Sequence, residues 1–293
     1  MNLRRVSFCV GAVTVLLLAG CSPIRTETMS LSAARRCLNN TVDFGHDGGV
    51  IRPDQLRRMG VELMIHRATL GGTKTDVDYA RRERSARVAG LKWGAYHYLK
   101  RRESVGAQMQ RFTNVVAATA RRNGTANHPV MLVLDNEGAD RVSWTELARA
   151  AQRVSGRTGV WPLLYCSVPS PGTAAFARQC QELEALSASE RQVLRECGLW
   201  VPRYGEQPDT RVTFSVPRVF GDWTFWQYCG DLSGRPKTAL AAMEFSGQVG
   251  GAFTRSGGRT SLRHFCDRNL FNGSPAEFER FYREHASAVS AWR

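Results

Sequence analysis

Two acidic residues, Asp135 and Glu137, stand at the end of an uninterrupted run of large apolar residues, 130–134. Side chains alternate across a strand, so positions two apart place both carboxyl groups on one face. An apolar run without alternation is typical of a strand covered on both sides in a parallel sheet, and such folds carry their chemistry at the carboxyl ends of the strands. The pair therefore predicts acid-catalysed bond cleavage. The alternative is an acidic pair that solvates a loop or caps the next helix.

The N-terminus predicts export and a lipid anchor. Arg4 and Arg5 precede an apolar stretch, 6–20, which is short for a membrane span and fits the core of a signal peptide. The stretch ends in Leu-Ala-Gly-Cys, which resembles the lipobox of bacterial lipoproteins and implies cleavage before Cys21 and lipid on its sulfur. The alternative is a leftover cysteine in an uncleaved anchor. Acyl chains would hold the chain on a membrane while the domain stays in the aqueous phase.

These features set the expected layout of the chain. We expect a lipoprotein signal peptide over 1–20, a lipidated tether over 21–40 and one catalytic domain over 41–293. The domain would lie on the periplasmic side of the bacterial envelope, and Ser22 after the lipidated cysteine favours the outer membrane by resemblance to known lipoproteins.

Cysteine usage agrees with an oxidising compartment. An even number of cysteines remains after the signal peptide and the lipidated residue are set aside, which is compatible with three disulfides in any of fifteen pairings. Cys180 with Cys197 is a local candidate, and Cys37 could reach Cys266; scattered free thiols are the alternative. The six residues are Cys37, Cys166, Cys180, Cys197, Cys229 and Cys266.

Amino-acid composition excludes fewer classes of binding partner than the motifs do. The formal net charge is +14, but the basic residues are dispersed along the chain without a block, so nucleic-acid binding is not expected. A basic surface would attract a polyanionic cell wall or an anionic membrane, and this attraction would fade with salt.

Strands and helices alternate through the first half of the domain. Capping boxes at Ser143 and Ser274 mark two helix starts, and Ser187 marks another candidate. Strands are expected at 41–47, 62–70, 92–99, 130–134 and 161–167, and helices at 52–60, 78–89, 103–122 and 143–155.

The regular alternation of strands and helices ends after residue 167. A helical segment is expected within 174–196, followed by strands at 199–204, 224–228 and 265–270 with little helix between them. Insertions are expected near 171–196 and near 231–264, the second rich in glycine. Five βα-like units followed by three strands predict a single α/β domain of the TIM-like (β/α)5β3 barrel type.

Seven short segments appear in an order that resembles the family 25 glycoside hydrolases, the Chalaropsis-type lysozymes. The resemblance covers roughly 41–281 and implies a barrel that cleaves the β-1,4 bond between N-acetylmuramic acid and N-acetylglucosamine in peptidoglycan. It also implies that Asp43, Asp135, Glu137 and Asp267 are the active-site acids. The segments are Val42-Asp43-Phe44, Arg67-Ala68-Thr69, Gly94-Ala95-Tyr96-His97-Tyr98, Leu134-Asp135-Asn136-Glu137, Leu199-Trp200 through Tyr204, Trp226-Gln227-Tyr228 and Asp267-Arg268-Asn269.

The chemistry of the residues is consistent with that resemblance. A glycosidic oxygen leaves only when it is protonated, and crowded or buried carboxyl groups keep a proton at neutral pH. We predict Glu137 as the general acid and Asp135 as the partner of the cationic intermediate, with Asp43 and Asp267 orienting them. A spacing of about 6.6 Å between positions two apart leaves the retaining or inverting outcome open. Attack by the substrate's own N-acetyl group resembles a route proposed for the family.

Aromatic residues at strand ends are candidates for stacking on sugar rings. Barrel core is the alternative for each of them, and a satisfied interior histidine is the alternative for His97. No metal or cofactor is predicted, because no ligand spacing, phosphate loop or nucleophile elbow is present. The candidates for substrate contact are Tyr96, His97, Tyr204, Trp226 and Tyr228.

One departure from the family pattern affects the cleft. Where the family commonly has Lys-Ala-Thr-Glu-Gly after its second strand, this chain has Arg-Ala-Thr-Leu-Gly at 67–71, so one acid is missing. Two other functions therefore stay open: an inactive glycan-binding lipoprotein, and a hydrolase of a related glycan such as chitin. Retention of all four acids argues against a binder, because a binder gains little from crowded carboxylates. The sequence names no protein partner.

Overall fold

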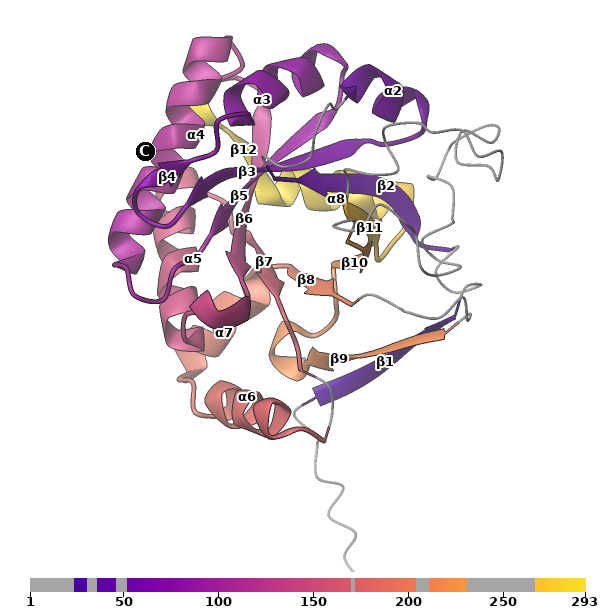
Figure 1. The fold of residues 1–293 in the computed structure, drawn as a ribbon, viewed down its shortest axis with the longest axis vertical. Helices are drawn as coiled ribbons and strands as arrows, with labels where there is room; N and C mark the ends of the chain where they lie inside the picture. The colour runs from indigo at the N-terminus through magenta and orange to yellow at the C-terminus, as the bar shows by residue number, and fades with distance from the viewer. Residues whose placement is uncertain (1–23, 31–35, 46–51, 170–171, 204–210, 231–266) are drawn as a thin grey trace, which may run out of the picture.

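A closed barrel of eight strands forms the centre of the computed structural model (Figure 1). The structure describes residues 24–30, 36–45, 52–169, 172–203, 211–230 and 267–293. Closure comes from pairing of β6 with β7 and of β2 with β11. In barrel order the strands are β2 Leu38–Phe44, β3 Leu63–Leu70, β5 Lys92–Tyr98, β6 Pro129–Asn136, β7 Leu163–Cys166, β8 Leu199–Pro202, β10 Phe225–Cys229 and β11 Asp267–Phe271.

Strand direction divides the barrel into a long parallel part and one reversed strand. The neighbours from β2 round to β10 are parallel, whereas β11 is antiparallel to both β10 and β2. The predicted mixed α/β barrel is thereby confirmed. Most carboxyl ends of the strands meet at one rim, where parallel barrels carry their sites.

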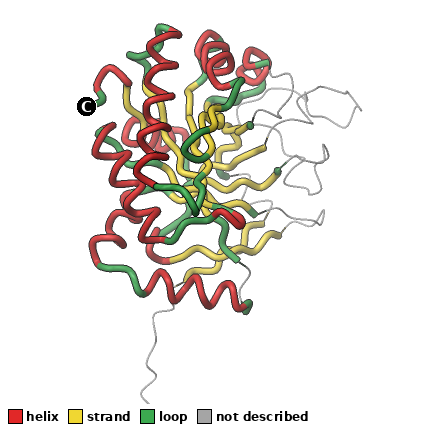
Figure 2. Tube along the Cα trace, turned by 60° about the vertical axis from the view of Figure 1, so that its left-hand side comes forward, coloured by secondary structure: helices red, strands yellow, loops and turns green. Residues whose placement is uncertain are grey.

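Helices cover the outside of the barrel (Figure 2). The three expected capping boxes are present at Ser143, Ser187 and Ser274; in each, a glutamate three residues later accepts from the serine backbone N–H. The helices are α2 Pro53–Arg58, α3 Tyr79–Val88, α4 Val105–Asn123, α5 Trp144–Thr158, α6 Ala174–Glu184, α7 Ala188–Glu196 and α8 Pro275–His285.

Alternation along the strands sorts the residues into two cores. On β6, Val130, Leu132 and Leu134 face the helices, whereas Met131 and Val133 face the barrel interior. Helix α8 contributes to the interior core through Phe278 and Tyr282. The Tyr282 hydroxyl donates to the carbonyl oxygens of Trp93 and Pro129, at 3.1 and 2.9 Å. The barrel is therefore closed at the amino end of its strands, which leaves the carboxyl end for the site.

Several predicted boundaries differ from the structure. The first barrel strand begins at Leu38, inside the expected tether, and ends at Phe44. Within that tether, β1 Ile24–Ser30 pairs antiparallel with β9 Arg211–Pro217 to form a separate two-stranded sheet. A two-stranded ribbon depends on long-range pairing, which local sequence patterns do not report.

The two expected insertions have different outcomes. The segment near 171–196 forms α6 and α7, whereas 231–264 lies outside the described residues. The remaining short elements are β4 Lys74–Thr75, β12 Ala286–Ala288 and the 3-10 helices η1 Gly138–Asp140, η2 Arg218–Phe220 and η4 Val289–Ala291.

The disulfide expectations find no support in the described residues. Cys180 and Cys197 are free thiols, so the local pairing proposed from the sequence is wrong. Cys266, the suggested partner of Cys37, lies outside the described residues.

In the described part of the chain, no helix has the length and apolar character needed to cross a membrane.

Candidate active site

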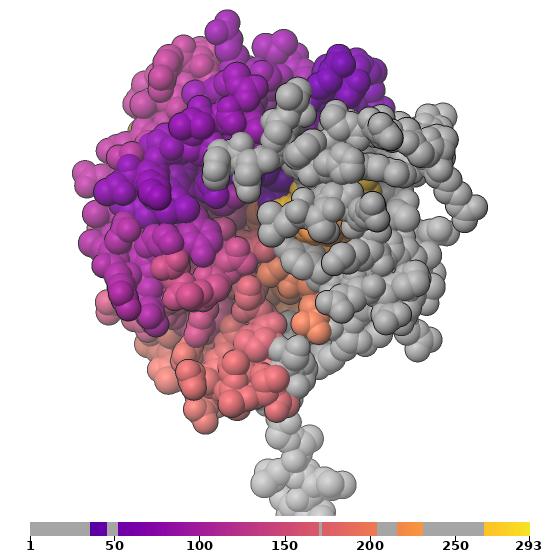
Figure 3. Space-filling model, viewed as in Figure 1, coloured from indigo at the N-terminus to yellow at the C-terminus, as the bar shows by residue number. Residues whose placement is uncertain are grey.

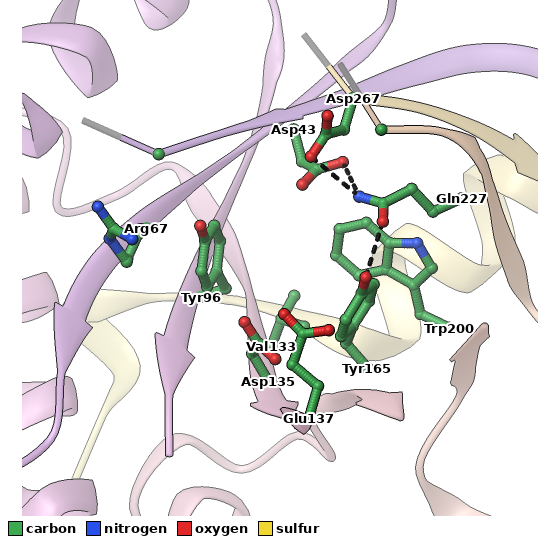
Figure 4. A pocket seen from close by; sticks show the side chains of 12 residues that line it. Asp43, Arg67, Tyr96, Val133, Asp135, Glu137, Tyr165, Trp200, Gln227 and Asp267 are labelled. Atoms are coloured by element: carbon green, nitrogen blue, oxygen red, sulfur yellow. Dashed lines mark hydrogen bonds between the residues drawn. The ribbon is translucent and has the colours of Figure 1, made fainter. Parts of the chain in front are cut away.

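A pocket of 370 Å³ lies at the carboxyl ends of the barrel strands, and acidic, aromatic and apolar side chains line it. The four acids predicted from the sequence all line it. Figure 4 shows Asp135 and Glu137 on one side and Asp43 and Asp267 across the cavity from them. Asp43 and Asp267 are direct neighbours because β2 and β11 pair in this register. Barrel closure therefore brings together acids that lie more than 220 positions apart in the sequence.

Asp43 is held by two amide groups. Gln227 Nε2 and Asn269 Nδ2 donate to its Oδ1, at 2.9 and 2.8 Å. Tyr165 in turn donates to Gln227 Oε1 at 2.7 Å, and Trp200 Nε1 donates to Asn269 Oδ1 at 2.8 Å. This network fixes the Asp43 carboxylate of β2 through side chains from four other strands, β7, β8, β10 and β11.

Burial and hydrogen bonding act on Asp43 in opposite directions. Burial raises its pKa to about 6, while the amide donors of Asn269 and Gln227 lower it and the charge of Glu137 raises it again. Donors that bond the charged form favour ionisation. Asp43 therefore changes charge in the mildly acidic range.

Asp135 is buried without such support. Its residue is 7% exposed, and Oδ1 has no hydrogen-bond partner among the described residues. Burial raises the pKa of Asp135 well above its ordinary value, the charges of Glu137 and Asp43 raise it further, and Arg67 lowers it. A buried acceptor without a partner is costly, so this oxygen is available to a donor from a ligand or from water.

Glu137 follows the end of β6 in an extended conformation, with φ −133° and ψ 172°. Alternation therefore continues past the strand and keeps Glu137 on the face of Asp135, as the sequence predicts. Gly138 comes next with φ 63°, a conformation that side chains rarely adopt, and turns the chain away from the pocket. Burial raises the pKa of Glu137 and so favours its protonated form.

Arg67 supplies a cation to the pocket wall from β3. Its Nε lies 3.2 Å from Oδ2 of Asp76, whose side chain is fully buried. This ion pair fixes the guanidinium beside Tyr96, on the side of the pocket opposite Gln227 (Figure 4). Leu70, which stands where the family commonly has an acid, lines a neighbouring cavity together with Arg67 rather than the acid pocket.

Only part of the predicted aromatic set faces this pocket. Tyr96 lines it, as expected. Trp226 and Tyr228 are buried in the outer core, where Trp226 Nε1 donates to the Arg203 carbonyl oxygen and the Tyr228 hydroxyl donates to Asn39 Oδ1. The prediction that Trp226 and Tyr228 contact substrate is therefore wrong, because Phe225 and Gln227 take the inward positions on β10.

His97 is also misassigned by the sequence prediction. It neighbours the inward-facing Tyr96 on β5 and must therefore point outward. The ring bonds Thr69 and Gln108, packs 5.4 Å from the Phe112 ring and is fully buried. Burial lowers its pKa to about 4, so it is a neutral core histidine at physiological pH. Tyr204 lies outside the described residues.

Sequence reasoning missed four polar or aromatic residues that build the pocket. Gln227 and Asn269 hold Asp43, and Tyr165 and Trp200 support them, with ring centroids 5.0 Å apart in an edge-on arrangement. One signal was available: a glutamine between two aromatic residues of a buried strand needs a hydrogen-bond partner inside the protein.

The described part of the chain has no group of three His, Cys, Asp or Glu side chains that could hold a metal ion.

Comparisons with known proteins agree with this architecture. The family model of glycosyl hydrolases family 25 matches residues 42–234. Over 244 residues the chain is 25% identical to lysozyme M1 of Streptomyces globisporus, covering 80% of this chain and 68% of that protein.

Solved structures share the fold. A muramidase from Acremonium alcalophilum superposes with a TM-score of 0.53 at 19% identity, covering 83% of this chain and 97% of that one. A lysozyme from Streptomyces coelicolor superposes with a TM-score of 0.52 at 22% identity, covering 87% and 98%.

Proposed function

Because the chain belongs to family 25 of the glycosyl hydrolases, we propose that it hydrolyses the β-1,4 bond between N-acetylmuramic acid and N-acetylglucosamine in peptidoglycan. The observation that carries the proposal is the gathering of Asp43, Asp135, Glu137 and Asp267 around one pocket. The relatives called lysozyme and muramidase support the choice of substrate. The residue roles below are part of the proposal.

Glu137 is the general acid. It lies nearer the mouth than Asp135 and keeps partial exposure, so it can reach the oxygen that links the two sugars. Two neighbouring carboxyl groups with raised pKa values titrate as a pair, so that after the first ionisation they share one proton. In the reactive form Glu137 holds that proton and Asp135 is ionised.

The reaction then proceeds with help from the substrate. The N-acetyl carbonyl oxygen of muramic acid attacks the anomeric carbon, the bond to the departing oxygen breaks, and Glu137 gives that oxygen its proton. Oδ1 of Asp135, which has no hydrogen-bond partner among the described residues, accepts the acetamido N–H, and the carboxylate stabilises the positive charge of the new ring. Water then attacks the anomeric carbon, the bond between this carbon and the acetamido oxygen breaks and re-forms the N-acetyl group, and the water gives a proton to the Glu137 carboxylate, which restores the acid.

Asp43 and Asp267 complete the electrostatic environment. The Asp43 carboxylate is fixed by two amide donors and does not need a substrate group to satisfy it. Its negative charge raises the pKa of Asp135 and, with Asp267, makes the pocket attractive to a developing cation. We assign these two residues to tuning and orientation.

The test is fragment analysis after incubation with purified peptidoglycan. The protein is the mature chain from residue 21 with Cys21→Ser, and released fragments are reduced with borohydride and identified by mass spectrometry. New reducing ends on muramic acid are expected, with kcat lowered about 10³-fold by Glu137→Gln. Asp140→Asn is the matched control, because Asp140 follows on the same rim but pairs with Lys100 outside the pocket lining.

The same assay separates the alternatives. Binding to peptidoglycan without fragments would support an inactive glycan-binding barrel. Cleavage restricted to chitin oligomers would support a hydrolase of a different acetylated glycan. Ends on glucosamine instead of muramic acid would contradict the proposed bond.

The lipid anchor is a separate part of the proposal. We infer that Cys21 is acylated after cleavage of residues 1–20 and that the domain works on the periplasmic side of the envelope, at the outer membrane. The support is the apolar stretch ending in Leu-Ala-Gly-Cys. Mass spectrometry of the N-terminal peptide should show an acylated cysteine, and Cys21→Ser should abolish that mass; an unmodified peptide from the membrane-bound protein would contradict the anchor.

A further inference from the structure

A second cavity, lined by none of the catalytic acids, carries an excess of positive charge. It measures 290 Å³ and lies where α6, α7 and η2 meet. Arg191 and Arg195 of α7 and Arg218 of η2 line it, with Leu183 and Val219 as apolar wall. One carboxylate, Glu184, also lines the cavity, so three guanidinium groups face a single negative charge.

The arginines of this cavity, called here the arginine pocket, form no ion pair with the described residues. Arg195 and Arg218 are exposed, and within the described residues neither they nor Arg191 forms an ion pair. Arg191 instead donates to the Glu184 carbonyl oxygen at 3.3 Å and to that of Leu186, which fixes its guanidinium at the C-terminal end of α6. Arginine is the side chain best suited to phosphate, because its donors match the geometry of phosphate oxygens.

The position of the arginine pocket relative to the N-terminus suggests what fills it. Ile24, the first residue of β1, pairs with Pro217, and Arg218 is the next residue after Pro217. Cys21 is three positions before Ile24, so the cysteine lies within about 11 Å of Ile24 even when the chain is fully extended. A lipid on Cys21 would therefore bring its membrane next to these arginines.

The pictures agree with this placement. Figure 1 shows β1, β9 and α6 side by side at the lower end of the molecule, with α2 and α3 at the upper end. In the space-filling view of Figure 3 the salmon surface of α6 and α7 forms the lower end of the described part. The arginine pocket and the entry of the tether therefore lie at one end of the protein.

We propose that the arginine pocket binds the phosphate of anionic phospholipid headgroups, so that the domain lies with its α6 and α7 end against the membrane that holds its anchor. This inference goes beyond the hydrolase activity and rests on the proposed acylation of Cys21. Attraction between exposed charges fades within about 10 Å at ordinary salt, so a short tether is what brings the pocket into range. Two weak attachments, one lipid and one electrostatic, also restrict the orientation of the domain.

The experiment removes the lipid so that only the arginine pocket is measured. The mature chain from residue 21 with Cys21→Ser is sedimented with vesicles of phosphatidylcholine alone or mixed with phosphatidylglycerol. The double variant Arg195→Glu, Arg218→Glu is compared with Arg84→Glu, Arg121→Glu, which changes net charge equally on exposed positions of α3 and α4. Hydrolysis of dissolved peptidoglycan fragments is measured for every variant as a check of the fold.

Binding to the phosphatidylglycerol vesicles is expected for the parent chain and for the control variant. The arginine-pocket variant should bind at least about 25-fold more weakly, since each arginine near an anionic surface contributes about fivefold. Addition of inorganic phosphate should weaken vesicle binding of the parent chain. If charge reversal disturbs folding, Arg195→Gln with Arg218→Gln tests the same prediction.

Three results would overturn the inference. Equal binding to neutral and anionic vesicles would show that the headgroup charge is not recognised. Equal weakening in both double variants would show that only the overall charge matters. Binding of inorganic phosphate without binding to vesicles would show a free-anion site. None of these results depends on whether the chain cleaves peptidoglycan or carries lipid, so they are distinguishable from failure of the earlier proposals.

Discussion

The two sides of the acid pocket treat the same chemical group in opposite ways. On one side Asp43 accepts from Gln227 and Asn269, and its oxygen is satisfied before any substrate arrives. On the other side Asp135 has a buried oxygen with no partner among the described residues, next to Glu137. The Asp43 side is therefore built to stay fixed, whereas the Asp135 and Glu137 side is built to exchange hydrogen-bond partners and protons with a ligand.

Burial raises the pKa values of both Asp43 and Asp135, but different groups oppose its effect at the two residues. Hydrogen bonds to its charged form oppose the effect of burial on Asp43, whereas only the cation of Arg67 opposes the combined effect of burial and like charge on Asp135. Burial and like charge therefore favour the protonated form on the Asp135 and Glu137 side, whereas the amide donors favour the ionised form of Asp43. Pairs of carboxyl groups whose environments push their pKa values apart are the pattern expected of acid catalysis.

Among the variants that compare the fixed and the exchanging acid, Asp135→Asn should have the largest effect. The amide can still approach the substrate N–H but cannot stabilise a positive ring, so kcat is expected to fall about 10²- to 10³-fold. Removal of the neighbouring negative charge also favours the ionised form of Glu137 and lowers its pKa. The pH–rate profile should therefore lose activity on its alkaline side at a lower pH than in the parent chain. An unchanged kcat, measured by reducing-end release, would show that both sides of the pocket are equivalent.

An intermediate effect is expected for Gln227→Leu. The glutamine donates to Asp43 and favours its charged form, so its loss raises the pKa of Asp43 above about 6. If the reaction needs an ionised Asp43, activity rises with pH through this pKa, and the acidic side of the profile should move to higher pH. We expect about a tenfold loss of kcat at mildly acidic pH and a smaller loss at neutral pH.

The pH–rate profile of the same protein supplies the control for that prediction. A uniform loss at every pH would indicate damage to the fold rather than a change at Asp43. Thermal unfolding of Gln227→Leu and of the parent chain should be compared at both pH values to exclude that explanation.

The smallest effect is expected for Tyr165→Phe. This change removes only the hydroxyl that donates to Gln227 Oε1 at 2.7 Å and leaves the ring against Trp200. The free energy of unfolding should fall by about 1 kcal/mol, as for an ordinary buried hydrogen bond. Denaturant unfolding measures that loss, and kcat should change by only a few-fold. A loss as large as that of Asp135→Asn would mean that the fixed side takes part in the chemistry directly.

Much of this fold follows from local patterns. The alternating strands and helices up to residue 167 were predicted within a few residues, because apolar runs and capping boxes act over short distances. The β1 and β9 ribbon was not predicted, since its two strands are about 190 positions apart. The placement of Asp135 and Glu137 on one face was predictable, because it needs only the alternation of a single strand.

Which residues of β10 point into the barrel was not predictable from alternation within one strand. Trp226 and Tyr228 alternate with Phe225 and Gln227, and all four positions are buried, so either set could face the barrel. Burial on both faces removes the polar and apolar contrast that normally reveals which side is which. The same ambiguity led the prediction to His97 although its neighbour Tyr96 holds the inward position.

The amino-acid sequence by itself determined the class of chemistry, the alternation of strands and helices, and the sharing of one face by Asp135 and Glu137, because each depends on interactions within one segment. The tertiary structure alone decided which face of β10 is internal and which amides hold Asp43. Those outcomes depend on the register between β2, β10 and β11, and that register exists only once the sheet has closed on itself.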